Sequence, residues 1–259
     1  MNIPIYQIDA FASAVFAGNP AAVCPLERWL DDALLQAIAA ENNLSETAFF
    51  VAQGDHYALR WFTPTTEDDL CGHATLASAF VIWSVLDSAS DSVAFETASG
   101  RLVVRRDGDL LALDFPTLAP EACEAPDALL AGLGAAPRAV LAAKDYLVVY
   151  DSEEEIRSLR PDMAALASLD RRGVIVTAPG ARSDFVSRYF APASGIPEDP
   201  VTGSAHCTLT PYWSARLSKP RLHALQVSLR GGELFCEDRG ERVIIAGRAV
   251  QYLQGTIVL

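Results

Sequence analysis

The pattern of apolar and polar positions predicts strands alternating with helices in the first part of the chain. Ile3–Phe11, Thr47–Val51 and Tyr57–Phe62 have the apolar runs or strict alternation that is typical of strands. Between the first two of them, Glu27–Asn42 places its apolar residues on one helical stripe, which predicts an amphipathic helix. We therefore expect these elements to pack around a common core.

A second helix is predicted at Ala74–Leu86, where the residues are apolar almost all round. A short helix of this kind has to be buried on every face. The strands Arg101–Arg106 and Asp109–Phe115 follow it, and the Asp107-Gly108 turn predicts that they form a hairpin. Burial alone therefore favours an antiparallel sheet curled around a central helix, in the α+β class.

The second part of the chain is predicted to repeat this plan. The expected elements are three short helices, two strands and a long helix, at Asp127–Leu133, Glu153–Leu159, Asp162–Leu169, Val174–Thr177, Phe185–Phe190 and Ala205–Leu217. Pro211 lies inside the long helix and is expected to kink it, because proline removes a backbone hydrogen bond. Hairpins are expected at Gly231-Gly232 and Arg239-Gly240, and Arg248–Leu259 is expected to return as a strand to the first half.

The sequence itself also repeats. Three short matches recur in the same order, 128 to 132 residues apart: Arg60–Pro64 with Arg188–Pro192, Gly72–Ala74 with Gly203–Ala205, and Gly100–Leu102 with Gly232–Leu234. We therefore expect two similar domains, residues 1–116 completed by the strand 249–259, and residues 117–248. Small-molecule sites favour domain interfaces, so a site is expected where the two halves face each other.

Composition narrows the classes of function. The chain has 259 residues, of which 51% are hydrophobic, and no apolar run approaches the roughly 20 residues needed to cross a bilayer. A formal net charge of −13 argues against nucleic acid as a partner. Five scattered cysteines and an N-terminus without a signal-peptide pattern favour the cytoplasm.

Candidate chemistry gathers where the two long helices begin. Gly72-His73 and Gly203-Ser204 stand at these starts, where free backbone N–H groups and the helix dipole favour an anion. His73 is expected to stay neutral at such a position, and Ser204 would ordinarily be a helix cap. Asp199 precedes the second helix. Tight turns and helix caps remain the alternative explanation for each of these residues.

Glu46 belongs to one half only. At an offset of 128 residues its counterpart is Val174, so the repeat carries a single carboxylate there, as a one-base proton transfer requires. Taken alone, Glu46 would ordinarily be a solvated surface charge. Cys71 could act as an activated thiol, but Pro200-Val201 stands opposite, so a two-cysteine racemase is not expected. The sequence shows no metal-ligand spacing and no phosphate-binding or dinucleotide-binding motif.

Four ordered blocks resemble the PhzF-like isomerases, a family that shares its fold with diaminopimelate epimerase. The blocks are Asp9–Phe11 with Phe16–Pro20, Asn43–Phe49, Asp69–Thr75 and Asp199–His206. The resemblance covers essentially the whole chain. It implies two similar domains, each with a sheet rolled into a barrel around a central helix, and it implies a homodimer that needs no cofactor.

The resemblance also implies a reaction and a set of site residues. Glu46 matches the general acid/base of the family, His73 and Asp199 would hold the polar groups of the substrate, and Ser204 would bind its carboxylate. Asn19 and the helix starts at Gly72 and Gly203 are further expected binding positions. The implied chemistry is a proton shift on a small, possibly cyclic carboxylate such as a dihydro-hydroxyanthranilate. An epimerase without a two-cysteine mechanism and a non-catalytic small-molecule binder remain alternatives.

Overall fold

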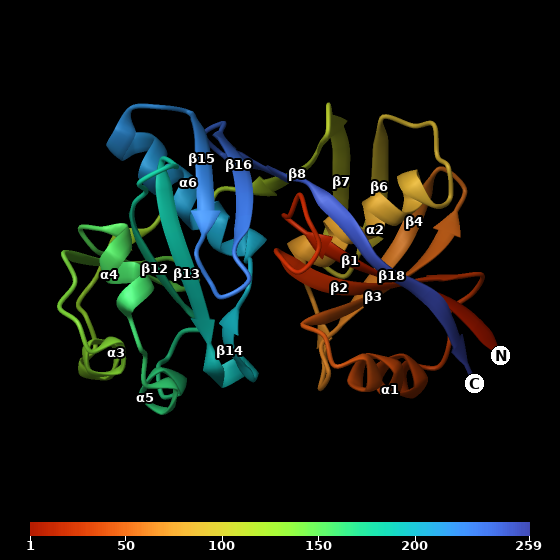
Figure 1. Cartoon of the computed structure of the whole chain (residues 1–259), viewed down its shortest axis with the longest axis horizontal. Helices are drawn as coiled ribbons and strands as arrows, with labels where there is room; N and C mark the ends of the chain where they lie inside the picture. Colours follow the sequence, from red (N-terminus) through yellow and green to blue (C-terminus); the bar gives the residue numbers. More distant parts are fainter. The chain divides into compact units, whose positions relative to one another are not determined.

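The computed structural model describes residues 1–259 and divides into two compact units (Figure 1). Unit 1 comprises Met1–Asp114 together with Ala246–Leu259, and unit 2 comprises Phe115–Ile245. Each unit is mostly sheet with few helices, so the expected α+β class is confirmed. No helix in the chain is both long enough and apolar enough to cross a membrane.

Unit 1 is one sheet with two helices. Its elements are β1 (Asn2–Ala10), β2 (Asn19–Leu26), α1 (Asp32–Asn42), β3 (Glu46–Gln53), β4 (His56–Phe62), β5 (Glu67–Asp68), α2 (Gly72–Ser84), β6 (Ser92–Thr97), β7 (Gly100–Asp107), β8 (Leu110–Pro116) and β18 (Ala249–Val258). The strands pair in the order β18–β1–β2–β3–β4–β6–β7–β8, and β5 pairs with the end of β4. The last strand of the chain, β18, therefore pairs with the first strand, β1, at one end of this strand order.

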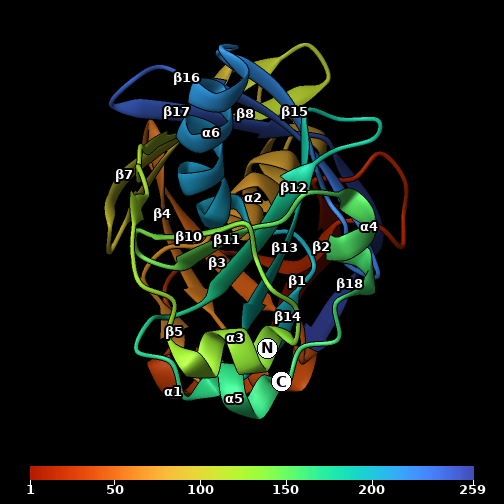
Figure 2. The same ribbon diagram turned by 90° about the vertical axis from the view of Figure 1, so that its left-hand side faces the viewer.

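Unit 2 repeats this order with shorter helices added. Its elements are β9 (Glu121–Ala122), α3 (Asp127–Leu133), β10 (Ala139–Ala142), β11 (Tyr146–Val149), α4 (Glu153–Ser158), α5 (Met163–Ala167), β12 (Val174–Pro179), β13 (Phe185–Ala191), η1 (Pro192–Ser194), β14 (Ile196–Asp199), α6 (Gly203–Leu217), β15 (Arg221–Gln226), β16 (Gly232–Asp238) and β17 (Arg242–Gly247). The strands β9–β10–β11–β12–β13–β15–β16 pair in this order, and β14 pairs with the end of β13 (Figure 2).

The pairing differs from the expected antiparallel sheet at two places in each unit. The pairs β2–β3 and β4–β6 in unit 1 are parallel, and so are β11–β12 and β13–β15 in unit 2. Each of these pairs is connected through one or two helices. Two parallel neighbours need a crossover connection rather than a tight hairpin, so the helices between the strands explain the mixed sheets.

The central helix of each unit lies in its core. In α2 every residue from Gly72 to Trp83 except Phe80 is buried, as its all-round apolar sequence predicts. In α6 burial is concentrated in the first half of the helix. Pro211 lies inside α6 and cannot donate to the carbonyl of Cys207. The backbone N–H of Leu118 donates to that carbonyl instead, at 3.0 Å, so the freed acceptor is satisfied.

The start of the first helix differs from the expected one, because apolar residues just before the helix continue its apolar pattern. The first helix begins at Asp32 rather than at the expected Glu27, because the side chain of Asp31 accepts a hydrogen bond from the N–H of Ala33 and caps it. Trp29 and Leu30 still pack on the same cluster as the helix, but from the preceding loop. Apolar periodicity alone does not distinguish these two arrangements.

Candidate active site

The candidate residues of unit 1 lie at the starts of three neighbouring elements. Asn19 is the first residue of β2, Glu46 the first of β3 and His73 the second of α2. The parallel ladder places Glu46 opposite Ala21, two residues beyond Asn19. All three side chains are buried, with 0%, 4% and 6% of their surface exposed. The structure therefore gathers them at one end of the β2–β3 pair.

Gly18 forms the tight bend that leads into β2 at this end of the sheet. Its φ of +67° belongs to the left-handed region, and a Cβ there would lie 2.1 Å from the carbonyl oxygen of Ala10. Only glycine tolerates both the conformation and this close approach. Asn19 follows directly and pairs with Ala10 in the β1–β2 ladder. The glycine thus places the Asn19 side chain at its position beside His73.

The hydrogen bonds of His73 define its tautomer. The side-chain amide of Asn19 lies with its nitrogen Nδ2 3.3 Å from Nδ1 of His73. Because an amide nitrogen only donates, Nδ1 is the acceptor and the ring proton sits on Nε2. Burial lowers the pKa of His73 from 6.5 to about 3. The imidazole is therefore neutral near pH 7 and can donate from Nε2. The cause is burial of the ring and not, as expected from the sequence, its position at a helix start.

Cys71 occupies the N-cap position of α2, but its side chain forms no capping hydrogen bond. Its sulfur lies 3.4 Å from Nδ1 of His73, and the hydroxyl of Thr75 donates to its carbonyl. The side chain of Cys71 therefore does not cap the N–H groups of the first turn. A helix start of this kind favours an anionic group.

The candidate residues of unit 2 surround the start of α6. Asp199 is the last residue of β14 and is buried, and Ser204 lies partly exposed in the first turn of the helix. The N-cap is Thr202, so the alternative explanation of Ser204 as the helix cap is wrong. The hydroxyl of Thr202 donates to Oδ2 of Asp199 at 2.5 Å. The structure therefore brings Asp199 and the helix start together through a residue that we did not single out from the sequence.

Strand register corrects the counterpart of Glu46. Thr47 pairs with Phe62 in unit 1, and Val174 pairs with Phe190 in unit 2. Because Phe62 and Phe190 are equivalent in the sequence repeat, Val174 corresponds to Thr47. The position that corresponds to Glu46 is therefore Gly173, not Val174. The conclusion that no carboxylate occupies this position in the second repeat still holds.

Gly173 leaves room that another side chain fills. A Cβ at Gly173 would lie 2.3 Å from the hydroxyl of Tyr189. That hydroxyl donates to the buried Asp145 at 3.2 Å, and burial raises the pKa of the Asp145 carboxyl. Unit 2 therefore keeps an acid near this end of its sheet, but it comes from the neighbouring strand end and is held by a tyrosine. No repeat in the sequence indicated it.

The helix starts also correct the counterpart of Cys71. Cys71 is the N-cap of α2 and Thr202 the N-cap of α6, so these two residues correspond, rather than Cys71 and Pro200-Val201. A threonine cannot serve as the second thiol of a two-cysteine racemase. The corrected pair, Cys71 and Thr202, therefore still lacks the second thiol that this mechanism needs.

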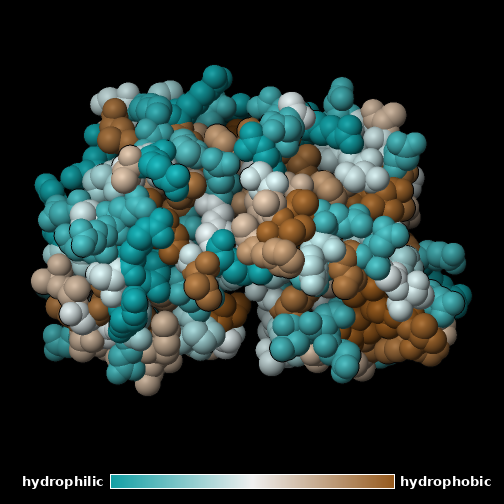
Figure 3. Space-filling view, in the orientation of Figure 1, coloured by the Kyte–Doolittle hydropathy of each residue, from teal (hydrophilic) through white to brown (hydrophobic).

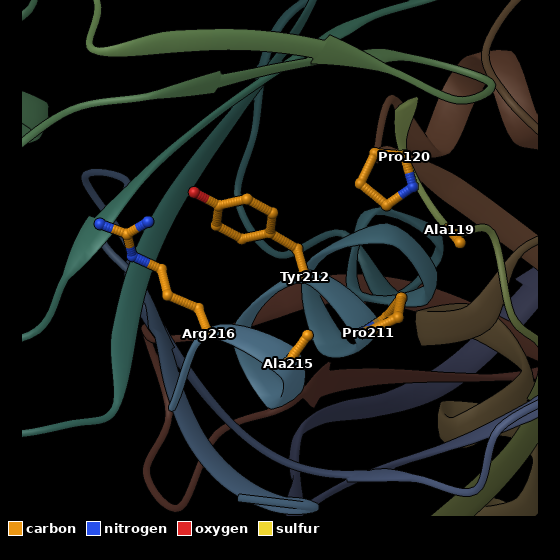
Figure 4. Close-up of a pocket in the computed structure, with 6 residues that line it drawn as sticks. All are labelled: Ala119, Pro120, Pro211, Tyr212, Ala215 and Arg216. Carbon is orange, nitrogen blue, oxygen red and sulfur yellow. The ribbon is translucent and has the colours of Figure 1, made fainter. Parts of the chain in front are cut away.

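Two surface grooves lie away from these residues. One, of about 440 Å³, lies in unit 2 beside α6 and is lined by Pro211, Tyr212, Ala215 and Arg216 with Ala119 and Pro120 (Figure 4). The other, of about 210 Å³, lies in unit 1 and includes Trp83 and Arg106, whose guanidinium lies 4.8 Å from the centre of the indole ring. Neither groove contains a candidate residue.

Comparison with known proteins decides the family. The sequence model of a protein family described as phenazine biosynthesis-like protein matches residues 8–255 of the chain. The chain belongs to this family. An uncharacterized isomerase of Pseudomonas aeruginosa is 58% identical over 100% of both chains. A crystal structure of a PhzF-family protein from Enterococcus faecalis shares 49% sequence identity, covers 100% of both chains and superimposes with a TM-score of 0.98.

Membership of the phenazine biosynthesis-like family confirms the expected resemblance and the expected enzyme class, an isomerase. The fold extends to more distant proteins. A hydroxyproline epimerase from Agrobacterium vitis, 11% identical, covers 99% of this chain and 92% of its own with a TM-score of 0.62. The architecture is therefore shared with epimerases, and the reaction has to be argued from the site.

Proposed function

We propose that this isomerase shifts a proton within a small carboxylated substrate and that Glu46 is its single general acid/base. Glu46 is buried at the start of β3, among the residues that carry the family resemblance. A carboxylate that first removes and later returns a proton has to exchange it near neutral pH, and burial favours the protonated form of an acid. A dihydro-hydroxyanthranilate is the substrate with which we begin.

The other candidate residues hold the substrate in this proposal. Neutral His73 donates from Nε2 to an oxygen on which negative charge develops, since this nitrogen is buried and has no partner within the protein. Asp199 binds a polar group of the substrate. Ser204 and the backbone amides that begin at Gly72 and Gly203 bind its carboxylate, while Asn19 fixes the His73 ring.

The difference between the repeats carries the proposal. Two units with the same strand order place Glu46 in one and Gly173 in the other. A two-base epimerase needs an acid or a thiol on each side of the carbon, whereas a suprafacial proton shift needs one. The positions that differ at the helix starts, Cys71 and Thr202, do not supply a matched pair of bases either.

The test uses D₂O and the Glu46→Gln variant. The protein is incubated with the dihydro-hydroxyanthranilate in D₂O, and deuterium is followed by NMR. We expect conversion with deuterium at one ring carbon, and a loss of activity of at least about 10³-fold in Glu46→Gln with a nearly unchanged Tm. Glu41→Gln, an exposed glutamate on α1, is the matched control and should retain full activity.

Other outcomes separate the alternatives. Deuterium entering at a stereocentre without migration of a double bond would establish an epimerase. Substantial turnover that survives in Glu46→Gln would mean that another residue is the base. Binding of the substrate without any proton exchange would reduce the protein to a small-molecule binder. We also propose a homodimer, which light scattering after size-exclusion chromatography tests directly.

A further inference from the structure

Gln226 is buried and all of its side-chain groups are engaged around Asp199. It is the last residue of β15, with 1% of its surface exposed. Its amide nitrogen Nε2 donates to the backbone carbonyl of Asp199 at 2.8 Å and to the hydroxyl of Thr202 at 3.2 Å. Its oxygen Oε1 accepts from the backbone N–H of Thr202 at 2.9 Å. One glutamine thus joins the end of β14 to the cap of α6.

These contacts fix the direction of the next hydrogen bond. Because Nε2 of Gln226 can only donate, the hydroxyl oxygen of Thr202 is its acceptor. The single hydrogen of that hydroxyl is then directed to Oδ2 of Asp199, 2.5 Å away. The carbonyl of Thr202 is also held, because Nδ1 of His206 donates to it at 2.8 Å. Thr202 is therefore fixed at its N–H, its carbonyl and its hydroxyl.

We propose that Gln226 and Thr202 are positioning residues that set the orientation of the Asp199 carboxylate for the substrate. This inference rests on the proposed function of Asp199. A hydrogen bond to a charged acceptor is short and about twice as strong as one between neutral groups. Gln226 acts through Thr202 and through the backbone of Asp199, and neither residue needs to touch the substrate.

The other repeat shows that the fold does not require this arrangement. The hairpin ladders pair Gln226 with Gly232 in unit 2 and Thr97 with Gly100 in unit 1. Because Gly232 and Gly100 are equivalent in the sequence repeat, Thr97 is the counterpart of Gln226. The hydroxyl of Thr97 donates to the carbonyl of Gly100 within its own turn. The counterpart of Thr202 is Cys71, which has no comparable hydroxyl. Unit 1 forms the same sheet around its helix without the glutamine or the threonine.

The experiment compares Thr202→Val, Thr202→Ser and Gln226→Leu in the full-length protein. With the dihydro-hydroxyanthranilate as substrate, Thr202→Val and Gln226→Leu are expected to lower kcat by about 10- to 100-fold and to change KM less than about threefold. Thr202→Ser keeps the hydroxyl and should restore most of kcat. Thr97→Val, at the counterpart of Gln226, is the matched control and should leave kcat unchanged.

Two readouts separate this inference from the proposed function. In the Asp199→Asn background, Thr202→Val should add almost nothing, because both changes remove one interaction. Crystal structures of the variants test the orientation without any turnover. We expect the Asp199 carboxylate to rotate away in Thr202→Val and to keep its place in Thr202→Ser. An unmoved carboxylate, or additive losses, overturns the positioning role, whereas full activity of Asp199→Asn overturns the proposed role of Asp199 itself.

Discussion

His73 and His206 are both buried, yet the structure holds their rings in opposite tautomers. Nδ1 of His73 accepts from Asn19, so its proton lies on Nε2. Nδ1 of His206 donates to the carbonyl of Thr202, so its Nε2 carries the lone pair. Burial lowers the pKa of His73 to about 3 and that of His206 to about 4, from 6.5 in both cases. The same physical cause thus leaves one ring as a donor in the candidate site and fixes the other within the core.

These two pKa values predict how stability depends on pH. Both are lowered in the folded state, so the stability they contribute is fully present above pH 6.5 and is lost as the pH falls towards 4. Each histidine should account for about 1.4 kcal/mol of unfolding free energy per pH unit between pH 6 and 5. Urea unfolding at several pH values measures this slope. His206→Leu should remove about one histidine's share of it, and an unchanged slope would contradict the assignment.

An Arg–Glu pair ties a short strand to a long one in each repeat. In unit 1 Arg60 on β4 donates twice to Glu67 on β5, and in unit 2 Arg188 on β13 donates twice to Glu198 on β14. Each guanidinium also lies over a phenylalanine two residues further on, at 5.1 Å in unit 1 and 4.9 Å in unit 2. These repeated contacts support the segment that leads to each helix start, so the repeat is kept in this scaffold.

The two pairs should differ in their contribution to stability. The side chains of Arg188 and Glu198 are 11% and 24% exposed, against 25% and 41% for Arg60 and Glu67. Arg188 also donates to the carbonyls of Ile156 and Leu159. We expect Arg188→Met to cost about 2–3 kcal/mol, because it removes the charged donor from the partly buried Glu198 carboxylate and from the carbonyl of Ile156. Arg60→Met should cost about 1 kcal/mol. Urea denaturation compares the two losses of unfolding free energy. Equal losses would contradict the expectation that the more buried pair contributes more to stability.

The elements that the sequence predicted well are those with strong local signals. The all-round apolar α2 was placed within two residues, and the hairpin at Asp107-Gly108 has the positive φ that its glycine permits. The parallel pairs were missed because period-two alternation is the same in parallel and antiparallel strands. Gln226 ends an ordinary alternating strand, so nothing local distinguishes it from a surface residue. Its role depends on register, which relates residues far apart in the chain.

At the scale of the whole molecule, the repeat is kept where it supports the fold and broken where chemistry is proposed. The strand order, the parallel pairs and the Arg–Glu pairs recur in both units. Glu46 against Gly173, His73 against Ser204 and Cys71 against Thr202 do not match. A duplicated sheet and helix thus supply two similar frames, and the differences between them can supply an acid on one frame and a held carboxylate on the other. The proposed reaction depends on the difference between Glu46 and Gly173.

The ends of the chain meet within unit 1. The N–H of Leu259 donates to the carbonyl of Met1 at 2.9 Å, and β18 pairs with β1 along its whole length. Large apolar side chains of the last strand are exposed, namely Tyr252, Leu253 and Val258, and apolar surface gathers over this part of unit 1 in Figure 3. The strand nevertheless covers the edge of β1, whose Ile3 and Ile8 are buried. The sheet of unit 1 therefore depends on both ends of the chain, although the ends need not be free.

This arrangement predicts that the chain tolerates circular permutation but not truncation. A permutant that joins Leu259 to Met1 through about five Gly/Ser residues, with new ends at Gly54, keeps every strand pair. Gly54 lies in the β3–β4 turn with a φ of +68°, and no atom lies within 4 Å of a Cβ added there. We expect the permutant to melt within a few degrees of the parent.

Deletion of residues 249–259 leaves the edge of β1 unpaired and should abolish cooperative unfolding of unit 1, as measured by circular dichroism. A truncated protein that melts like the parent would show that β18 is dispensable, and a permutant that fails to fold would show that the free ends themselves matter.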